Sequence, residues 1–329
     1  MALCLGAPDH GYYMSRDPFG AEGDFITAPE VSQVFGELIG VWCAGAWAAM
    51  GQPAAFNLVE LGPGRGTLMA DMLRTLARAA PAMRAAAAVH LVDMSPVLRS
   101  LQARTLGQAG ATWHESLDSL PDGPTILVAN EFFDAIPIRQ FERRDGRWHE
   151  RVIGLREDKL VLGLAMADLG GQGSDGDVIE FAPARSDIAR AIGSRLRQHP
   201  GAALIIDYGH AQTAPGDTLQ AMRQHRQVSI LETPGATDLT SHVDFEALAK
   251  ALAAEGAAVY PLLSQRAFLL AMGIEQRFAM LSARADATTK AVLARQMTRL
   301  AAADQMGNLF KILAATSAGL ATPYPFGRQ

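Results

Sequence analysis

The stretch that decides the fold is Phe56-Asn57-Leu58-Val59-Glu60-Leu61-Gly62-Pro63-Gly64-Arg65-Gly66, an apolar run that leads into three alternating glycines. Apolar residues then recur with the spacing of an amphipathic helix, at Leu68, Met69, Met72, Leu73 and Leu76. A strand, a glycine-rich loop and a helix in this order form the unit with which α/β sheets bind nucleotide-like ligands. We therefore predict an α/β fold with a ligand site at Gly62, Gly64 and Gly66.

Two common ligands of such loops do not fit this pattern. The dinucleotide motif needs glycine where the chain has Thr67, and the lysine of a phosphate-binding P-loop is absent. Glu60 would repel a pyrophosphate but suits a ligand that carries an ammonium group. S-adenosylmethionine has an amino-acid end, a ribose and an adenine but no phosphate, and we predict it as the cofactor. A tight turn without a ligand is the alternative for the loop alone, and an NAD-dependent dehydrogenase is a more remote one.

A second strand end supports this prediction. Val89–Asp93 is an apolar run that ends in an acid, and the Asp93 carboxylate is suited to both ribose hydroxyls. Met94, Ser95 and a proline follow, as expected for a helix capped by Ser95. Residues 111–116 read as a third unit whose Trp113 fits either an adenine-binding wall or the core. We add its last two residues to the expected cofactor contacts, Glu115 and Ser116.

Two further strand ends carry polar side chains. Ile126–Asp134 leaves an apolar strand with Asn130, Glu131 and Asp134 at its end. Polar groups at this edge are costly unless they are hydrogen-bonded or face a ligand. The alternative is that Asn130 and Asp134 cap the following turn. At the other strand end, Asp207 and His210 follow the apolar run that begins at Leu204. His210 fits a structural role better than that of a general base.

Composition narrows the class of protein. The chain has 329 residues, 49% of them hydrophobic, which is enough for one large core or two modest ones. Its net charge of −5 and lack of a basic run give no sign of a nucleic-acid partner. Cys4 and Cys43 lack metal-ligand spacing, which predicts a reducing compartment, no disulfide and no metal. Val41–Met50 is too short to span a membrane, and we expect a bacterial cytoplasmic protein without a leader.

The pattern along the chain divides it into an N-terminal segment, residues 1–54, and an α/β domain, residues 55–329. Two insertions interrupt the α/β pattern. Short alternating runs around Asp145-Gly146 predict antiparallel ribbons at about 138–182, whereas about 211–241 is polar and rich in turns. The expected elements outside the insertions include helices at about 29–50, 187–198, 243–254 and 275–302, and strands at about 203–207, 257–263 and 309–314.

Long motifs spread over nearly the whole chain resemble one family. They are Gly11–Tyr13, Gly23–Glu30, Phe35–Leu38, Glu60–Gly66, Ala129–Pro137, Asp207–Gly209, Asp238–Phe245 and Phe268–Gly273. Together they are similar to the MidA family of S-adenosylmethionine-dependent methyltransferases, which includes a mitochondrial complex I assembly factor. The resemblance implies a class I, Rossmann-like methyltransferase fold with a mostly parallel seven-stranded sheet and an antiparallel last strand. The N-terminus is shorter than is usual in the family.

The resemblance also implies an activity. Mitochondrial matrix members methylate a protein arginine to symmetric dimethylarginine on an NADH dehydrogenase subunit, so a protein substrate is expected. Because an arginine side chain is cationic with five donors, carboxylates suit it. We expect Glu131 first, then Asn130 and Asp134, to be catalytic. The expected substrate contacts are Asp24, Glu30, Tyr13, Asp207, Tyr208 and His242.

The N-terminal segment is expected to close over the cofactor as a lid, with Thr27 in contact with it. Asp24 in a turn and Glu30 in the first turn of a helix are the plain structural alternatives. Trp42 and Trp47 fit the core or a subunit interface better than a ligand site, so a homodimer stays open. Two other functions also stay open: methylation of a small molecule or a different protein, and a non-catalytic assembly factor.

Overall fold

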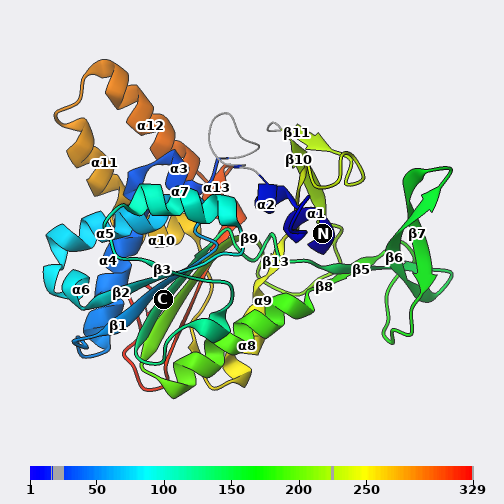
Figure 1. Cartoon of the computed structure of the whole chain (residues 1–329), viewed down its shortest axis with the longest axis horizontal. Helices are drawn as coiled ribbons and strands as arrows, with labels where there is room; N and C mark the ends of the chain where they lie inside the picture. Colours follow the sequence, from blue (N-terminus) through cyan, green and yellow to red (C-terminus); the bar gives the residue numbers. More distant parts are fainter. Residues whose placement is uncertain (16, 18–25, 224–225, 328–329) are drawn as a thin grey trace.

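The computed structural model describes residues 1–15, 17, 26–223 and 226–327. Its centre is a mixed, mostly parallel sheet with helices on both faces (Figure 1). Seven strands follow one path in the order β14-β16-β9-β4-β1-β2-β3, and β13 and β15 pair with β9 and β16 beside it. The strands are β1 (Phe56–Leu61), β2 (Ala87–Val92), β3 (Thr112–His114), β4 (Thr125–Asn130), β9 (Gly201–His210), β13 (Val243–Asp244), β14 (Ala258–Val259), β15 (Leu263–Ser264) and β16 (Phe310–Thr316).

Strand direction brings the predicted site together. β1 is parallel to β2 and β4, β2 to β3, and β4 to β9, so the carboxyl ends of these strands lie at one edge. β16, the last strand, runs antiparallel to β9. Within the described residues the sheet has nine strands where we expected seven, because the two-residue strands β13 and β15 pair beside the seven-strand path. The expected strand at 257–263 is the pair of short strands β14 and β15.

Helices cover both faces because side chains alternate along each buried strand. In β1, Leu58 packs with α4, α5 and α10, whereas Val59 packs with α8 and α9. The helices are α1 (Ala2–Gly6), α2 (Tyr12–Ser15), α3 (Ala28–Val31), α4 (Gln33–Ala49), α5 (Thr67–Ala79), α6 (Pro81–Ala86), α7 (Pro96–Leu106), α8 (Pro183–Gln198), α9 (Phe245–Ala254), α10 (Gln265–Ala271), α11 (Ile274–Ser282), α12 (Ala287–Ala301) and α13 (Met306–Leu309). Among the described residues, none of these helices is long and apolar enough to cross a bilayer.

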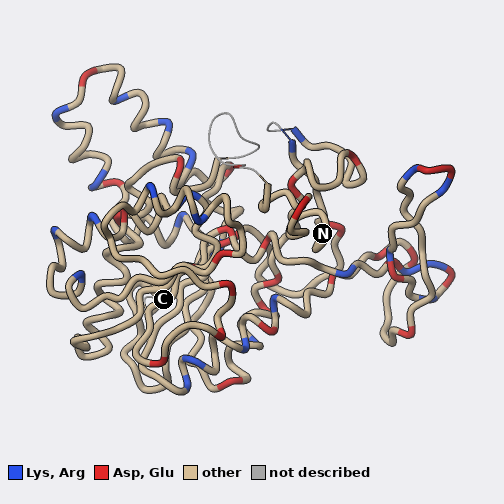
Figure 2. The backbone as a smooth tube through the Cα atoms, viewed as in Figure 1, with Lys and Arg blue, Asp and Glu red and all other residues tan. Residues whose placement is uncertain are grey.

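The first insertion forms a separate antiparallel sheet that projects from the body as an arm (Figure 1). Its strands are β5 (Arg139–Arg144), β6 (Arg147–Arg156), β7 (Lys159–Met166) and β8 (Val178–Phe181), in the order β7-β6-β5-β8. Asp145 and Gly146, with φ of 51° and 73°, make the tight turn that joins β5 to β6. The predicted ribbons are therefore confirmed, and Figure 2 shows both signs of charge along the arm.

The second insertion also contains a sheet, which the sequence analysis missed. β10 (Gln220–Arg223) pairs antiparallel with β11 (Arg226–Val228) and β12 (Asp238–Thr240). Strands of three or four residues are too short to display an alternating pattern. This sheet packs Ala221 and Leu239 against Leu5 and Tyr12 of the N-terminal helices.

Two predicted helices are each divided in the structure. The helix expected at 29–50 is split at Ser32, whose hydroxyl accepts the N–H of Val34 at 3.4 Å and begins α4. The helix expected at 275–302 ends at Ser282 and begins again after Asp286, whose carboxylate accepts the N–H of Thr289 at 2.7 Å. In both cases a side-chain cap competes with a continuous helix.

We predict that two glycines of α4 respond oppositely to alanine. A Cβ on Gly36 would lie 2.5 Å from Cβ of Asp71 in α5, so Gly36→Ala should lower the free energy of unfolding by about 1–3 kcal/mol. The matched change Gly45→Ala meets no atom within 4 Å and should raise it by about 0.5–1 kcal/mol. Urea unfolding followed by circular dichroism measures both. Equal effects would contradict close packing of α4 on α5.

Candidate active site

A cavity of about 1060 Å³ lies at the carboxyl edge of the sheet. It is lined by thirteen of the predicted site residues: Tyr13, Thr27, Gly62, Gly64, Asp93, Met94, Ser95, Glu115, Ser116, Glu131, Asp134, Tyr208 and His242. A smaller cavity of about 40 Å³ shares Thr27, Gly62, Gly64 and Glu131 with it, and adds Glu30, Glu60 and Asn130. Gly66 and Asp207 line neither cavity.

The three glycines of the loop have left-handed backbone conformations, which explains the residue type. The φ angles of Gly62, Gly64 and Gly66 are 59°, 53° and 82°. Gly66 is the N-cap of α5, so its part is to begin the helix rather than to line the cavity. A Cβ on Gly62 would lie 2.8 Å from the ring of Phe132, so this position is also restricted by packing.

Two buried polar atoms beside the smaller cavity have no hydrogen-bond partner among the described residues. They are Oε2 of Glu60, at the end of β1, and Oδ1 of Asn130, at the end of β4. Glu60 is 2% exposed, and burial raises the pKa of its carboxyl to about 8. Unpaired buried acceptors of this kind are costly, so the cavity is suited to a ligand that donates hydrogen bonds, such as an ammonium group.

Asp93 follows β2 with its carboxylate already oriented. Oδ1 accepts the N–H of Ser95 at 2.8 Å, and Oδ2 accepts the side-chain amide of Gln102 at 2.7 Å. Burial raises the pKa of the Asp93 carboxyl. The Ser95 hydroxyl caps α7 by accepting the N–H of Leu98 at 3.1 Å and donates to the carbonyl of Tyr13 at 2.6 Å. This serine therefore joins the cofactor edge to the N-terminal helices.

The remaining expected cofactor contacts lie at the rim. Met94 is 61% exposed, and the side chain of Glu115 is 83% exposed, with Arg99 at 3.9 Å. Ser116 follows β3 beside them. Trp113, for which two interpretations were open, packs against the core and donates to Oε1 of Gln102 at 2.8 Å. Trp42 and Trp47 are likewise part of the core.

Glu131 occupies the junction of the two cavities. Its Oε1 accepts the N–H of Ala28 at 2.9 Å and the side-chain amide of Asn130 at 3.1 Å. Burial raises the pKa of the Glu131 carboxyl to about 7, and the nearby Asp134 adds to the rise, although the Ala28 N–H opposes it. Its φ of 50° is uncommon for a residue with a side chain. This carboxylate is therefore balanced between its two protonation states near neutral pH.

The N-terminal segment contacts the glycine loop through side chains. Glu30 of α3 accepts the hydroxyl of Thr67 at 2.7 Å and lies 3.8 Å from Arg65. Tyr13 of α2 donates to Asp238 of the second insertion at 3.0 Å. Asp24, an expected substrate contact, lies outside the described residues.

Asp207, an expected substrate contact, lines neither cavity, and its carboxylate binds backbone N–H groups of the protein. It is 0% exposed and accepts the N–H groups of Phe133, Asp134 and Tyr208 at 3.0, 3.1 and 2.9 Å. Burial raises the pKa of this carboxyl well above its usual value. The side chain thus fixes the loop after β4 to β9. It lies at the expected strand end but faces the protein.

Arg185 of α8 is a residue that the sequence analysis missed. It is 4% exposed and donates to the carbonyls of Asp134 and His242 at 3.1 and 2.7 Å and to the hydroxyl of Ser241 at 2.6 Å. It therefore holds two loops of the cavity together. Nothing in the pattern of α8 signals this, because its partners lie 51 to 57 residues away.

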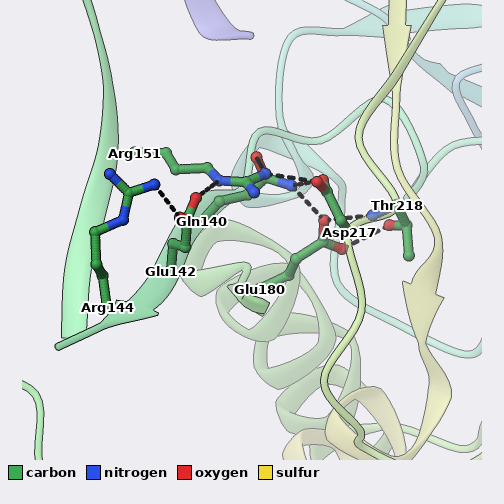
Figure 3. Close-up of polar contacts among 7 residues, drawn as sticks. All are labelled: Gln140, Glu142, Arg144, Arg151, Glu180, Asp217 and Thr218. Atoms are coloured by element: carbon green, nitrogen blue, oxygen red, sulfur yellow. Dashed lines mark hydrogen bonds and ion pairs between the residues drawn. The ribbon is translucent and has the colours of Figure 1, made fainter. Parts of the chain in front are cut away.

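His242 is held in place by the base of the arm. The backbone N–H of His242 donates to the hydroxyl oxygen of Thr218 at 2.9 Å, and the Thr218 hydroxyl donates to Oε2 of Glu180 in β8 at 2.6 Å. Burial lowers the pKa of the His242 imidazole. Figure 3 shows the polar network that continues from here into the arm, made of Gln140, Glu142, Arg144, Arg151, Glu180, Asp217 and Thr218. Both insertions therefore support one wall of the cavity.

Comparison with known proteins agrees with this site. Residues 38–262 match the family described as "Putative S-adenosyl-L-methionine-dependent methyltransferase". Protein arginine methyltransferase NDUFAF7, mitochondrial, of Danio rerio is 35% identical over 94% of this chain and 81% of the relative. The protein of the same name from Homo sapiens is 35% identical over 85% of this chain and 70% of the relative.

Solved structures support the same conclusion. A protein from Burkholderia thailandensis, crystallised with S-adenosylhomocysteine, is 30% identical, and the likeness covers 98% of this chain and 87% of that chain with a TM-score of 0.87. A second structure from that organism is 29% identical, with a TM-score of 0.84. The chain belongs to the S-adenosyl-L-methionine-dependent methyltransferase family and is a methyltransferase that uses this cofactor.

Proposed function

We propose that the protein is a protein arginine N-methyltransferase that forms symmetric dimethylarginine on an NADH dehydrogenase subunit and so serves complex I assembly. The names of the curated relatives support arginine as the acceptor. The observation that carries the proposal is the Glu131 carboxylate, whose pKa near 7 and place at the junction of the two cavities suit proton transfer from an arginine nitrogen. The same proposal includes a protein substrate and a bacterial cytoplasmic location. It is compatible with a monomer or a homodimer.

We infer a class I, Rossmann-like methyltransferase domain at residues 55–329. The strand order β3-β2-β1-β4-β9-β16-β14, with β16 antiparallel, supports this inference. Residues 1–54 are proposed as a lid segment. Support comes from the hydrogen bonds of Ala28 with Glu131, Glu30 with Thr67, and Tyr13 with Ser95, which join this segment to the cavity walls.

The donors and acceptors of the cavity fit the cofactor. We propose that the unpaired oxygens of Glu60 and Asn130 accept from its ammonium group, and that Asp93 accepts from its ribose hydroxyls. Gly62, Gly64 and Thr27 bring main chain close to it. Gly66 supports the loop, and Met94, Ser95, Glu115 and Ser116 border the nucleoside end. When bound, S-adenosylmethionine supplies an electrophilic methyl group.

The protein must then position the acceptor and take one proton from it. A guanidinium nitrogen that gains a methyl group loses a proton, and Glu131 is the proposed acceptor of that proton, held at Oε1 by Ala28 and Asn130. Asp134, Tyr13, Tyr208 and His242 are proposed to surround the substrate group. Asp207 and Glu30 hold neighbouring segments, and Asp24 remains a proposed contact.

Cofactor binding should release a proton through Glu60. An ammonium ligand favours the ionised carboxylate, so affinity for S-adenosylhomocysteine should rise with pH and level off above about 8. Glu60→Gln should weaken binding by about tenfold or more and remove this proton release. Calorimetry in two buffers of different ionisation enthalpy counts the protons, and Glu60→Gln corrects for titration of the ligand itself. Identical proton release in both proteins would exclude this role.

Glu131→Gln should lower kcat by about 10²- to 10⁴-fold, because the acceptor proton then lacks a base. In the wild type, kcat/KM should rise with pH and level off above about 7, since Glu131 must be ionised. The assay uses methyl-labelled cofactor with a cell extract, followed by mass spectrometry of labelled proteins. Glu275→Gln, at an exposed position of α11, is the matched control and should keep full activity. Label confined to small metabolites would contradict arginine as the acceptor.

A further inference from the structure

Beyond Glu131, the cavity wall contains a second acid without a full set of partners. Asp134 lines the cavity, is 7% exposed, and its Oδ1 has no hydrogen-bond partner among the described residues. A buried carboxylate oxygen in this state raises the free energy of the folded protein. Because rotation about χ2 of a carboxylate is soft, either oxygen can be presented to the cavity. The Tyr208 hydroxyl already hydrogen-bonds the Asp134 carboxyl group, and the unpartnered Oδ1 leaves the wall able to accept one further donor.

The charges around Asp134 favour a cationic donor. The buried carboxylates of Glu131 and Asp207 lie close enough to affect its electrostatics, and burial raises the pKa of the Asp134 carboxyl. Arg185 supplies a buried positive charge nearby, but it donates its hydrogen bonds to carbonyl and hydroxyl oxygens of Asp134, Ser241 and His242. A cation in this corner of the cavity would relieve the repulsion among the three acids.

The surrounding side chains favour a flat cation over a compact one. The ring of Tyr208 is edge-on to the rings of His242 and Phe310, with centroids 5.5 Å away in each case. Gln220 and Thr240, which pair across β10 and β12 of the second insertion, line the same cavity, and the Thr240 side chain hydrogen-bonds Tyr208. A guanidinium is planar, stacks on aromatic rings and has five donors, whereas a lysine ammonium is a strongly hydrated point charge.

We propose that Asp134 is the residue that binds the guanidinium group of the acceptor arginine and selects arginine over lysine. This inference rests on the proposed function and divides the work between two acids. Asp134 binds and orients the acceptor, while Glu131 takes the proton. The inserted sheet β10-β12 is then part of the acceptor pocket, since it supplies one wall of it.

The test measures binding rather than turnover. The probes are acetyl-Gly-Arg-Gly-amide and its lysine counterpart, titrated by calorimetry into the full chain saturated with S-adenosylhomocysteine. The wild type should bind the arginine peptide about tenfold or more tightly than the lysine peptide. Asp134→Asn should lose about tenfold or more of that affinity and its preference, with unchanged affinity for S-adenosylhomocysteine. The control Asp187→Asn, in the same cavity but with a side chain 69% exposed, should behave as the wild type.

A stability measurement separates recognition from folding. The folded-state pKa of Asp134 is raised, so its ionised form opposes folding at neutral pH and its neutralisation should not destabilise the protein. Asp134→Asn without ligands should therefore keep or raise the Tm at pH 7.5. A lower Tm, or unchanged arginine affinity in Asp134→Asn, would overturn the inference while leaving the methyltransferase proposal intact. A wild type that binds S-adenosylhomocysteine but neither peptide overturns it as well. If the extract assay places label only on small metabolites, that result contradicts the proposed function instead.

Discussion

The constraint on which this structure depends is a group of acids buried near the ends of parallel strands, at the edge of the sheet where the cavity lies. Glu60 is the next-to-last residue of β1, Asp93 follows β2, and Glu131 and Asp134 follow β4, so these acids lie at one edge of the sheet. Burial raises the pKa of each of these carboxyls. A chain that folds in this way accepts an unfavourable electrostatic arrangement, which binding of a cationic ligand relieves. Both ligands of the proposed reaction, a sulfonium amino acid and a guanidinium, are cationic.

The rest of the fold makes that edge rigid. Asp207 ties the loop after β4 to β9 by accepting two backbone N–H groups of that loop, and Arg185 ties the same loop to the segment before β13. Neither side chain needs to touch a ligand for the site to depend on it. Glu60, Asn130 and Asp134 each keep one buried oxygen without a partner among the described residues, and all three line the cavities.

The sequence allowed prediction of those features that depend on local pattern. The glycine loop, the strand ends and the turn at Asp145-Gly146 follow from periodicity and backbone preference, and the structure has each in the expected place. Helix ends were less predictable, because the caps at Ser32 and Asp286 outweigh a continuing apolar pattern. Arg185 and the short strands β10-β12 could not be predicted. Their positions depend on partners distant in sequence, and no local signal carries that information.

The backbone of Glu131 has a consequence for engineering the protein. A left-handed φ costs a residue with a side chain about 1–2 kcal/mol, which glycine avoids and asparagine reduces. Selection of variants for heat resistance alone would therefore favour replacement at this position. Replacement of Glu131 would then raise heat resistance at the expense of turnover. A library screened for thermal stability should therefore keep the Glu131 codon fixed.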